Sequence, residues 1–572
     1  MMTRATEPIA LVSRDKPFML ADWHIDPASC RISKGDKTIR LEPKVMEVLV
    51  YLASNPEHVI SREELEEKIW TGTIVGYDAL TSTMLKLRKA FHDSPKDPQI
   101  IETVPKRGYR LIATVSPITD REQSSLTPSP ATSLATSIFK SRYWLISLVV
   151  VSILLIIGGM QLFRIAQNPA DISTKEATSR LSIAVLPLTN LSEDPNQEYF
   201  ADGLTNDLIT DLTRLSSLIV ISRDSTFDYK HGQKDIRKIA KELNARYILH
   251  GSVRRDQELI RINVILVDSE SGNNVWAERY DGGTHNIFEL QDKITQKIVS
   301  TLALKLTPAE QQYLTQPVTS NLDAYEYFLR GTERFFHYAR SSNVEARNFF
   351  SKATELDPNF AQAYAMLAWT HAFDFMNGWT DTPEKSLEIG EQLSTKALAL
   401  EKNIPVAYFV RGLIHREKGE YTKALADAEK AVHLDPSYAN GHVLQATLLY
   451  YAGRPQEGLE KIKFAIRLNP HHPFNYPFHL GQAYFVLGRY AEAITAFQDG
   501  LKSNPSSERL QIWLAATYAQ TGQLEDAKWQ IEQVKLVNPD LSLERQKQAF
   551  PFTDPADLDR FLNGLRAAGL TK

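Results

Sequence analysis

The longest apolar run of the chain spans residues 143–163, YWLISLVVVSILLIIGGMQLF, and contains no charged residue. About 20 apolar residues are enough for a helix to cross a hydrocarbon core roughly 30 Å thick. Lysine and arginine flank the run, and aromatic residues stand at its ends, where such rings favour the headgroup level. The alternative is a buried helix of a globular core, which rarely runs this long without a polar face. The pattern predicts a transmembrane helix.

Before this run, residues 17–113 show short strand and helix patterns that fit one compact domain. Short strands are expected at 18–25 and 30–41, with a Gly35-Asp36 turn between the halves of the second segment. Helices follow, and the last of them carries an apolar stripe at helical spacing within Leu80–Phe91. A hairpin over 99–113, with Pro-Lys-Arg at its tip, is expected to close the domain.

The last helix and the hairpin tip combine polar and cationic side chains. Away from the apolar stripe, the helix should present Ser82, Lys86 and Lys89 to solvent. A cationic helix can enter the major groove of DNA while a basic tip contacts phosphates or the minor groove. From charge alone, a solvated amphipathic helix remains the alternative. The candidate DNA-binding residues are Ser82, Thr83, Lys86, Arg88, Lys89, Lys106 and Arg107.

Three stretches of this domain carry a family resemblance: LEPKVMEVLVYLASNPEHVISREELEEKIW, LTSTMLKLRKAF and IIETVPKRGYRLIA. They resemble the winged helix-turn-helix of OmpR/PhoB-type regulators, in the version found in ToxR/CadC-type membrane regulators. The resemblance implies that Leu80–Phe91 is the recognition helix and that Lys106-Arg107 is the wing. No receiver domain is found in front of it, so a phosphorelay input is not expected.

A linker is expected over residues 114–142, where serine, threonine and proline dominate and too little apolar surface is available for folding. Beyond the apolar run, residues 180–316 alternate strand and helix patterns and then show a strand meander, which predicts an α/β domain with helices on one face of a mixed sheet. This region resembles the TolB-amino-terminal-like or FlgO-like module in two segments, IAVLPLTNLSEDPNQEYFADGLTNDLI and YILHGSVRRD.

Four carboxylates of this α/β region lie near expected strand ends: Asp202, Asp207, Asp211 and Asp224. They are interpreted as solvated surface acids, because the region lacks a GxGxxG motif, a Gly-x-Ser-x-Gly motif and a phosphate loop. The sequence therefore predicts that the protein is not an enzyme and needs no cofactor.

Prolines at 436, 470, 505 and 539 recur at intervals of 34 or 35 residues. This period matches the tetratricopeptide repeat. About six units are expected over 324–540, followed by a C-terminal cap over 541–572. Extra residues near 375–383 predict an aromatic loop, in which Phe375 and Trp379 are the candidate partner-binding residues.

Composition narrows the candidate chemistry. The net charge of −4 does not indicate a particular class of partner. Because Cys30 is the single cysteine, an intramolecular disulfide and a metal site built of cysteines are excluded. Eleven of the 14 histidines follow the apolar run, and pH sensing is conceivable for them. His471 and His472 could bind a metal, but no third ligand stands at a recognisable spacing, so ordinary surface histidines are expected and no metal site is predicted.

These observations predict a fold class of four parts: a winged helix, one transmembrane helix, an α/β domain and a helical tetratricopeptide solenoid. The predicted function is a membrane-anchored one-component transcriptional regulator, and the alternative is a membrane-anchored repeat scaffold for envelope proteins. Since the DNA-binding domain must be cytoplasmic, the N-terminus is placed in the cytoplasm and the later domains in the periplasm. The expected partners are promoter DNA, the inner membrane, an envelope peptide or protein, and a second copy of the chain on DNA.

Overall fold

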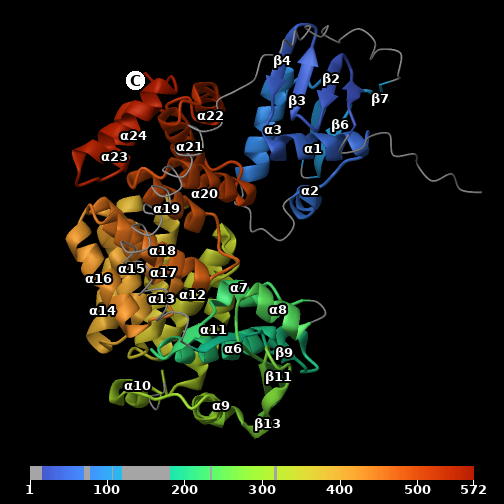
Figure 1. Cartoon of the computed structure of the whole chain (residues 1–572). Helices are drawn as coiled ribbons and strands as arrows, with labels where there is room; N and C mark the ends of the chain where they lie inside the picture. The colour runs from blue at the N-terminus through green and yellow to red at the C-terminus, as the bar shows by residue number, and fades with distance from the viewer. Residues whose placement is uncertain are drawn as a thin grey trace, which may run out of the picture. The chain divides into compact units, whose positions relative to one another are not determined.

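A computed structural model describes residues 16–69, 78–105, 107–118, 181–231, 235–314 and 318–571 (Figure 1). They form a winged-helix domain, a mixed α/β domain and a helical repeat region. The apolar run over 143–163, and most of the linker expected before it, lie outside the described residues.

Two expectations that concern a membrane need correction. Among the described residues, every helix is too short or too polar to span a bilayer. The longest of these helices, α14 (Pro383–Leu400), has 18 residues and carries charged side chains along its length. This finding contradicts the transmembrane helix in the expected fold class and the expected single-pass localisation in the inner membrane.

The winged-helix domain begins with an antiparallel sheet, to which a late strand adds at one edge. Its strand order is β4-β3-β2-β1-β7. Three helices and a two-stranded hairpin complete the domain, and their apolar faces enclose one core. The strands are β1 (Phe18–Leu20), β2 (Trp23–Asp26), β3 (Arg31–Lys34), β4 (Lys37–Arg40), β5 (Ile101–Val104), β6 (Gly108–Leu111) and β7 (Val115–Pro117), and the helices are α1 (Pro43–Ser54), α2 (Arg62–Ile69) and α3 (Asp78–Phe91).

The two strands expected at 18–25 and 30–41 are each a tight hairpin in the structure. β1 and β2 pair antiparallel with Leu20 opposite Trp23, so only two residues form the turn. Ala21 takes a positive φ of 50° there, as such a turn requires. In the second hairpin Gly35 has a φ of 57°, at the position where the sequence predicts a turn.

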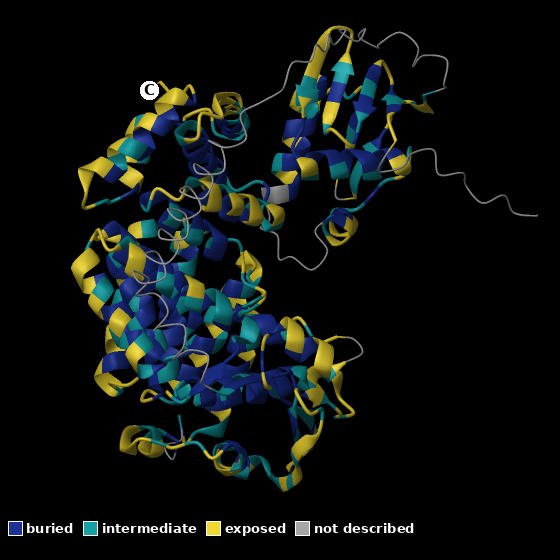
Figure 2. Cartoon of the chain, in the orientation of Figure 1, coloured by how far each residue is buried: buried dark blue, intermediate teal, exposed yellow. Residues whose placement is uncertain are grey.

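The α/β domain contains a mixed sheet in the order β10-β8-β11-β12-β13, with β9 pairing β11 off this path. β8 has parallel neighbours on both sides, whereas β11, β12 and β13 form an antiparallel meander. In Figure 2 the edge strand β13 is largely exposed or half-buried. The strands are β8 (Leu181–Val185), β9 (Thr189–Asn190), β10 (Leu218–Val220), β11 (Tyr247–Asp256), β12 (Leu259–Asp268) and β13 (Asn274–Gly283).

Helices cover both faces of this sheet, which corrects the expectation of helices on one face. Ile183 and Val185 belong to the core that includes α6 (Glu198–Thr213) and α9 (Ile287–Thr301). Their neighbours Ala184 and Leu186 point to the opposite face, where they pack with residues of α8 (Ile236–Glu242). Successive side chains of a strand point to opposite faces, so a strand that is apolar throughout needs cover on both sides.

The repeat region confirms the expected tetratricopeptide architecture. Its described residues form six antiparallel helix pairs, preceded by α10 (Pro308–Tyr313) and followed by α23 (Leu543–Ala549) and α24 (Pro555–Ala567). Gly481 shows why small residues recur, because an added Cβ there would lie 2.4 Å from the Phe497 ring. The pairs are α11 (Leu322–Phe335) with α12 (Arg340–Leu356), α13 (Ala361–Met376) with α14, α15 (Pro405–Glu417) with α16 (Tyr421–Leu434), α17 (Ala439–Tyr451) with α18 (Pro455–Leu468), α19 (Asn475–Val486) with α20 (Tyr490–Ser503), and α21 (Glu508–Gln520) with α22 (Leu524–Val537).

The α/β domain and the first repeats share a single hydrophobic core. Helices α6 and α11 lie side by side (Figure 1). They approach closely because Gly203 faces Leu329, and a Cβ on that glycine would lie 2.6 Å from the leucine side chain. The two domains therefore form one packed body.

Segments of the chain itself cover parts of the repeat surface. The short helix α7 (Arg223–Phe227) contacts two distant repeats: Tyr338 donates a hydrogen bond of 3.2 Å to Asp224, and Ser225 donates one of 2.5 Å to Asn469. Near the C-terminus, the link between α23 and α24 packs on the last repeats. The Phe550 and Phe552 rings in this link lie 5.1 Å from Trp513 and Tyr451, respectively.

Candidate nucleic-acid interface

Helix α3 is held in the winged-helix domain by one apolar stripe. Leu80, Met84, Leu87 and Phe91 are all buried in the domain core. Their spacing of three or four residues places them on one face, so the opposite side of the helix stays outside this core. Basic residues lie in the last turn, where the helix dipole favours positive charge.

The hairpin β5–β6 is tied to the end of α3 by a buried carboxylate. Asp93 accepts backbone hydrogen bonds from Gln99, Ile100 and Ile101, at 2.6, 3.2 and 2.9 Å. Three backbone donors on one carboxylate hold the residues that enter β5 in a fixed position. Asp93 thereby sets the distance between the last turn of α3 and the hairpin.

A glycine sets the second attachment of the hairpin. Tyr109 exchanges two backbone hydrogen bonds with Ile60, at 2.9 and 3.0 Å. This bridge brings Gly108 so close that an added Cβ would lie 2.0 Å from the Ile60 carbonyl oxygen. Gly108 also has a φ of 136°, which side chains rarely allow. Only glycine fits where strand β6 begins, directly after the hairpin tip.

The structure separates the lysines of the predicted recognition face. Lys86 is buried, and its ammonium group donates a hydrogen bond of 2.7 Å to Glu42, the residue that precedes α1. Thr83 is also buried, and Ser82 is half-buried. Lys89, in contrast, is exposed. The side of α3 that carries Thr83 and Lys86 is therefore covered, and Lys86 contacts the residue before α1 there.

Arg88 has a structural contact. Its guanidinium group donates hydrogen bonds to the Ile101 carbonyl at 3.2 Å and to the Thr103 hydroxyl at 2.5 Å, both on β5. The side chain therefore connects α3 to the hairpin. At the hairpin tip, Arg107 is exposed, whereas Lys106 lies outside the described residues.

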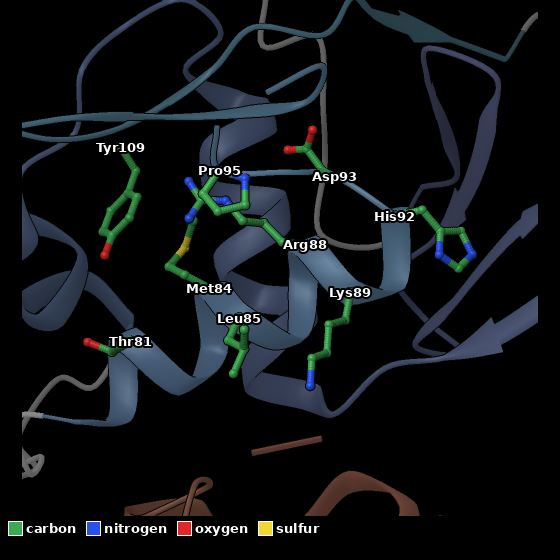
Figure 3. A pocket seen from close by; sticks show the side chains of 9 residues that line it. All are labelled: Thr81, Met84, Leu85, Arg88, Lys89, His92, Asp93, Pro95 and Tyr109. Carbon is green, nitrogen blue, oxygen red and sulfur yellow. The ribbon is translucent and has the colours of Figure 1, made fainter. Parts of the chain in front are cut away.

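The exposed stripe of α3 consists of Thr81, Leu85 and Lys89, one turn apart from each other. A hollow of about 580 Å³ opens beside it, between the helix and Tyr109 of β6. In Figure 3, Leu85 and Lys89 point to the same side of α3. Thr81 and Leu85 are not among the DNA-binding residues predicted from the sequence. A helical wheel places Leu85 roughly 130° from the centre of the apolar stripe, at about 100° per residue, and this signal could have found it.

The second candidate site, in the repeats, is less open than expected. Phe375 lies in the last turn of α13, and Trp379 follows in the link to α14; both are half-buried. The Trp379 ring packs 5.4 Å from that of Phe373. The extra residues of this repeat mainly lengthen its helices, which have 16 and 18 residues. The aromatic side chains therefore fold against the repeat.

The histidine pair has ordinary contacts. His471 pairs with Asp228 at 2.8 Å, and the His472 ring stacks on Tyr476 at 5.4 Å. Burial lowers the pKa of His472. Among the residues described, no three histidine, cysteine or acidic side chains come together as metal ligands would.

Family comparisons match each described domain. Residues 36–111 match the family "Transcriptional regulatory protein, C terminal", and residues 179–297 match "HilA/YgeH-like transcriptional regulator, second domain". Residues 484–548 match "Tetratricopeptide repeat", and residues 417–500 match "Anaphase-promoting complex, cyclosome, subunit 3". The expected TolB-like or FlgO-like character of the α/β domain stays a prediction.

Curated relatives include regulators that match over most of the chain. "Transcriptional activator CadC" of Escherichia coli is 22% identical over 79% of this chain and 93% of its own length. "Transcriptional regulator HilA" of Salmonella typhimurium is 21% identical over 80% of this chain and 71% of its own length. "Putative adenylate cyclase 3" of Rhizobium meliloti is 38% identical over 46% of this chain, and the match spans 43% of that relative's length.

Among solved structures, the DNA-binding domain of E. coli CadC is 32% identical, with 18% of this chain and 97% of that chain covered and a TM-score of 0.17. The tetratricopeptide protein YrrB is 22% identical over 33% of this chain and 93% of that chain, with a TM-score of 0.26.

The sequence comparisons identify homologues that are regulators, which favours a non-enzyme, although one homologue is named as a cyclase. They support a transcriptional regulator of the ToxR/CadC/HilA type, with a winged helix and tetratricopeptide repeats.

Proposed function

We propose that this chain regulates transcription by binding promoter DNA through α3 and the β5–β6 hairpin. The observation that carries the proposal is the exposure of Lys89 and Arg107 on two elements whose spacing is set by Asp93 and Gly108. A helix and a hairpin tip held at a fixed distance can contact a major groove and the adjacent backbone together. The match of residues 36–111 to a regulatory-protein family supports the same function.

The proposal assigns different tasks to the cationic side chains. Lys89 projects from the exposed stripe of α3, so it contacts a base edge or a nearby phosphate in the major groove. Arg107 at the hairpin tip contacts the phosphate backbone or the minor groove. Lys86 and Arg88 hold the domain together through Glu42 and β5.

The α/β domain and the repeats supply the signal input in this proposal. Their common core supports it, because a partner that binds one of them acts on the whole body. Tetratricopeptide repeats present extended surfaces that suit a peptide or protein partner. Phe375 and Trp379 keep part of their surface exposed and remain candidates for that contact. Two chains on repeated half-sites would combine their affinities for DNA.

The test is to enrich a binding sequence from a random duplex library with the full-length chain and then to titrate variants. Lys89→Ala should weaken binding to the enriched site by about 1–3 kcal/mol if the lysine contacts a base. Arg107→Ala should weaken binding to all sequences more evenly and reduce the slope of log K against log salt by about one.

The matched control is Lys238→Ala, which removes an exposed lysine from α8 of the α/β domain. Its affinity and salt slope should equal those of the wild type. The proposed interface is wrong if Lys89→Ala and Arg107→Ala both behave like this control. Failure to enrich any sequence would contradict the proposed function as a whole.

A further inference from the structure

An apolar side chain stands in the middle of the exposed stripe of α3. Leu85 is 40% exposed, with Thr81 one turn before it and Lys89 one turn after it. It is not part of the domain core, which takes Leu80, Met84 and Leu87 from the same helix. Among the described residues of the winged-helix domain, Ile112 is the other large hydrophobic residue with comparable exposure, at 40%.

The surroundings of Leu85 favour DNA over an apolar protein partner. Its neighbours on the stripe are a hydroxyl and an ammonium group, and Arg107 at the hairpin tip adds another exposed cation. The hollow beside it is lined by Met84, Arg88 and Tyr109 (Figure 3). The exposed side chains around Leu85 are therefore cationic, and Leu85 is the apolar side chain that projects among them. This combination suits a DNA duplex that presents an apolar group in its groove.

The major groove has such a group. Each base pair presents a pattern of donors and acceptors there, and thymine alone of the four bases adds a C5-methyl group. An aliphatic side chain that enters the groove gains free energy by packing on this methyl group, because both surfaces leave water. Leucine has no polar atom with which to discriminate the other base edges.

We propose that Leu85 is a specificity-determining residue that selects thymine through its C5-methyl group. The inference rests on the proposed function, because it requires α3 to lie in the major groove. One position of the DNA site is then a thymine whose methyl group packs against Leu85. This thymine lies next to the bases or phosphates that Lys89 contacts.

Deoxyuridine tests this contact, since it lacks the methyl group and keeps every hydrogen-bonding group of thymine. Each thymine of the enriched site is replaced singly, and binding of the full-length chain is titrated. At one or two positions per half-site, loss of the methyl group should weaken wild-type binding about fourfold, the factor expected for one buried methylene-sized group. The same replacements should leave the affinity of Leu85→Ala unchanged.

Ile112→Ala is the matched control, because it removes an equally exposed aliphatic side chain just after β6. It should keep the wild-type response to deoxyuridine. The inference is overturned if wild-type binding is unchanged at every thymine, or if Leu85→Ala responds at the same positions as the wild type. In either case the enriched site still shows sequence-specific binding, so the proposed function stands. If no sequence is enriched, both fail together.

Discussion

At the scale of single residues, two lysines three positions apart on α3 have different environments. Lys89 is exposed, whereas Lys86 is buried in an ion pair with Glu42. The difference does not come from the helix itself, since both lysines lie away from its apolar stripe. Lys86 pairs with Glu42, the residue before α1, whereas Lys89 lies on the exposed stripe of α3. Charge and helical spacing are therefore insufficient to assign a DNA contact.

This environment predicts a loss of stability for Lys86→Ala. The substitution leaves the buried Glu42 carboxylate without its cation, and breaking a buried pair in this way typically costs about 3 kcal/mol. Hydrogen exchange at the amides of α1 and α3 should show faster opening, because a multidomain chain does not unfold in one step. Lys89→Ala serves as the exposed control and should leave exchange unchanged. Normal exchange in Lys86→Ala, with binding to DNA lost, would instead identify Lys86 as a DNA contact.

At the scale of elements, helix α6 carries acids on the face that meets α9 and α11. Tyr325 donates a hydrogen bond to Asp207, and Gln291 donates another at 3.1 Å. Asp211 accepts one of 3.4 Å from Thr295. The expectation of solvated surface acids is wrong for these residues. Asp207 and Asp211 are half-buried, and Asp202 on the same helix is buried and pairs with Lys230 at 2.7 Å.

The packing of α6 predicts that stability falls as pH rises. Burial raises the pKa of Asp207 to about 6. Burial, reinforced by the Asp207 charge, raises the pKa of Asp211 to about 7. Aspartate in an unfolded chain has a pKa of about 3.9, so the folded state binds protons more tightly. The contribution of these bound protons to the free energy of unfolding is fully present below about pH 4. It is lost as pH rises through about 6 to 7.

Calorimetry should therefore show that Asp207 and Asp211 lower the unfolding temperature at pH 8 relative to pH 5, a difference opposed by His371, His442 and His479, whose pKa values burial lowers. The double variant Asp207→Asn, Asp211→Asn should reduce this difference, since the amides do not ionise. Asp435, whose pKa burial raises to about 6, remains and acts in the same direction. The exposed Asp540→Asn is the control and should retain the full difference. An equal pH response in the double variant and the control would contradict this account.

At the scale of the whole molecule, the chain covers part of its own repeat surface. Phe550 is buried against Trp513, and Thr553 donates a backbone hydrogen bond of 2.9 Å to Tyr451. The C-terminal helices thus continue the packing of the last repeats. A solenoid needs such a terminal element because its final repeat has no neighbour to cover its apolar side.

Phe550→Ala should consequently destabilise the last repeats by about 3 kcal/mol, the lower end of the range for truncating a buried phenylalanine. Urea titration followed by hydrogen exchange of α21 and α22 measures the effect. Leu524→Ala removes a side chain that is 43% exposed on α22, so its effect should stay within about 0.5 kcal/mol. Equal effects of the two substitutions would show that the C-terminal link is not part of the repeat core.

Features with local, periodic signals could be predicted from the sequence alone. The repeats follow from prolines at intervals of 34 or 35 residues, since each helix pair repeats the same short-range contacts. Helix α3 and the hairpin follow from apolar spacing and turn residues. Lys89 and Arg107 were selected correctly as exposed cations, although their contacts with DNA stay predictions.

Features that depend on distant parts of the chain were decided only by the tertiary structure. The burial of Lys86 depends on Glu42, which is 44 positions away, and the environment of Asp207 depends on Tyr325, which is 118 positions away. Periodicity tells which face of an element is apolar, but which polar face is covered depends on elements that fold against it from elsewhere in the chain.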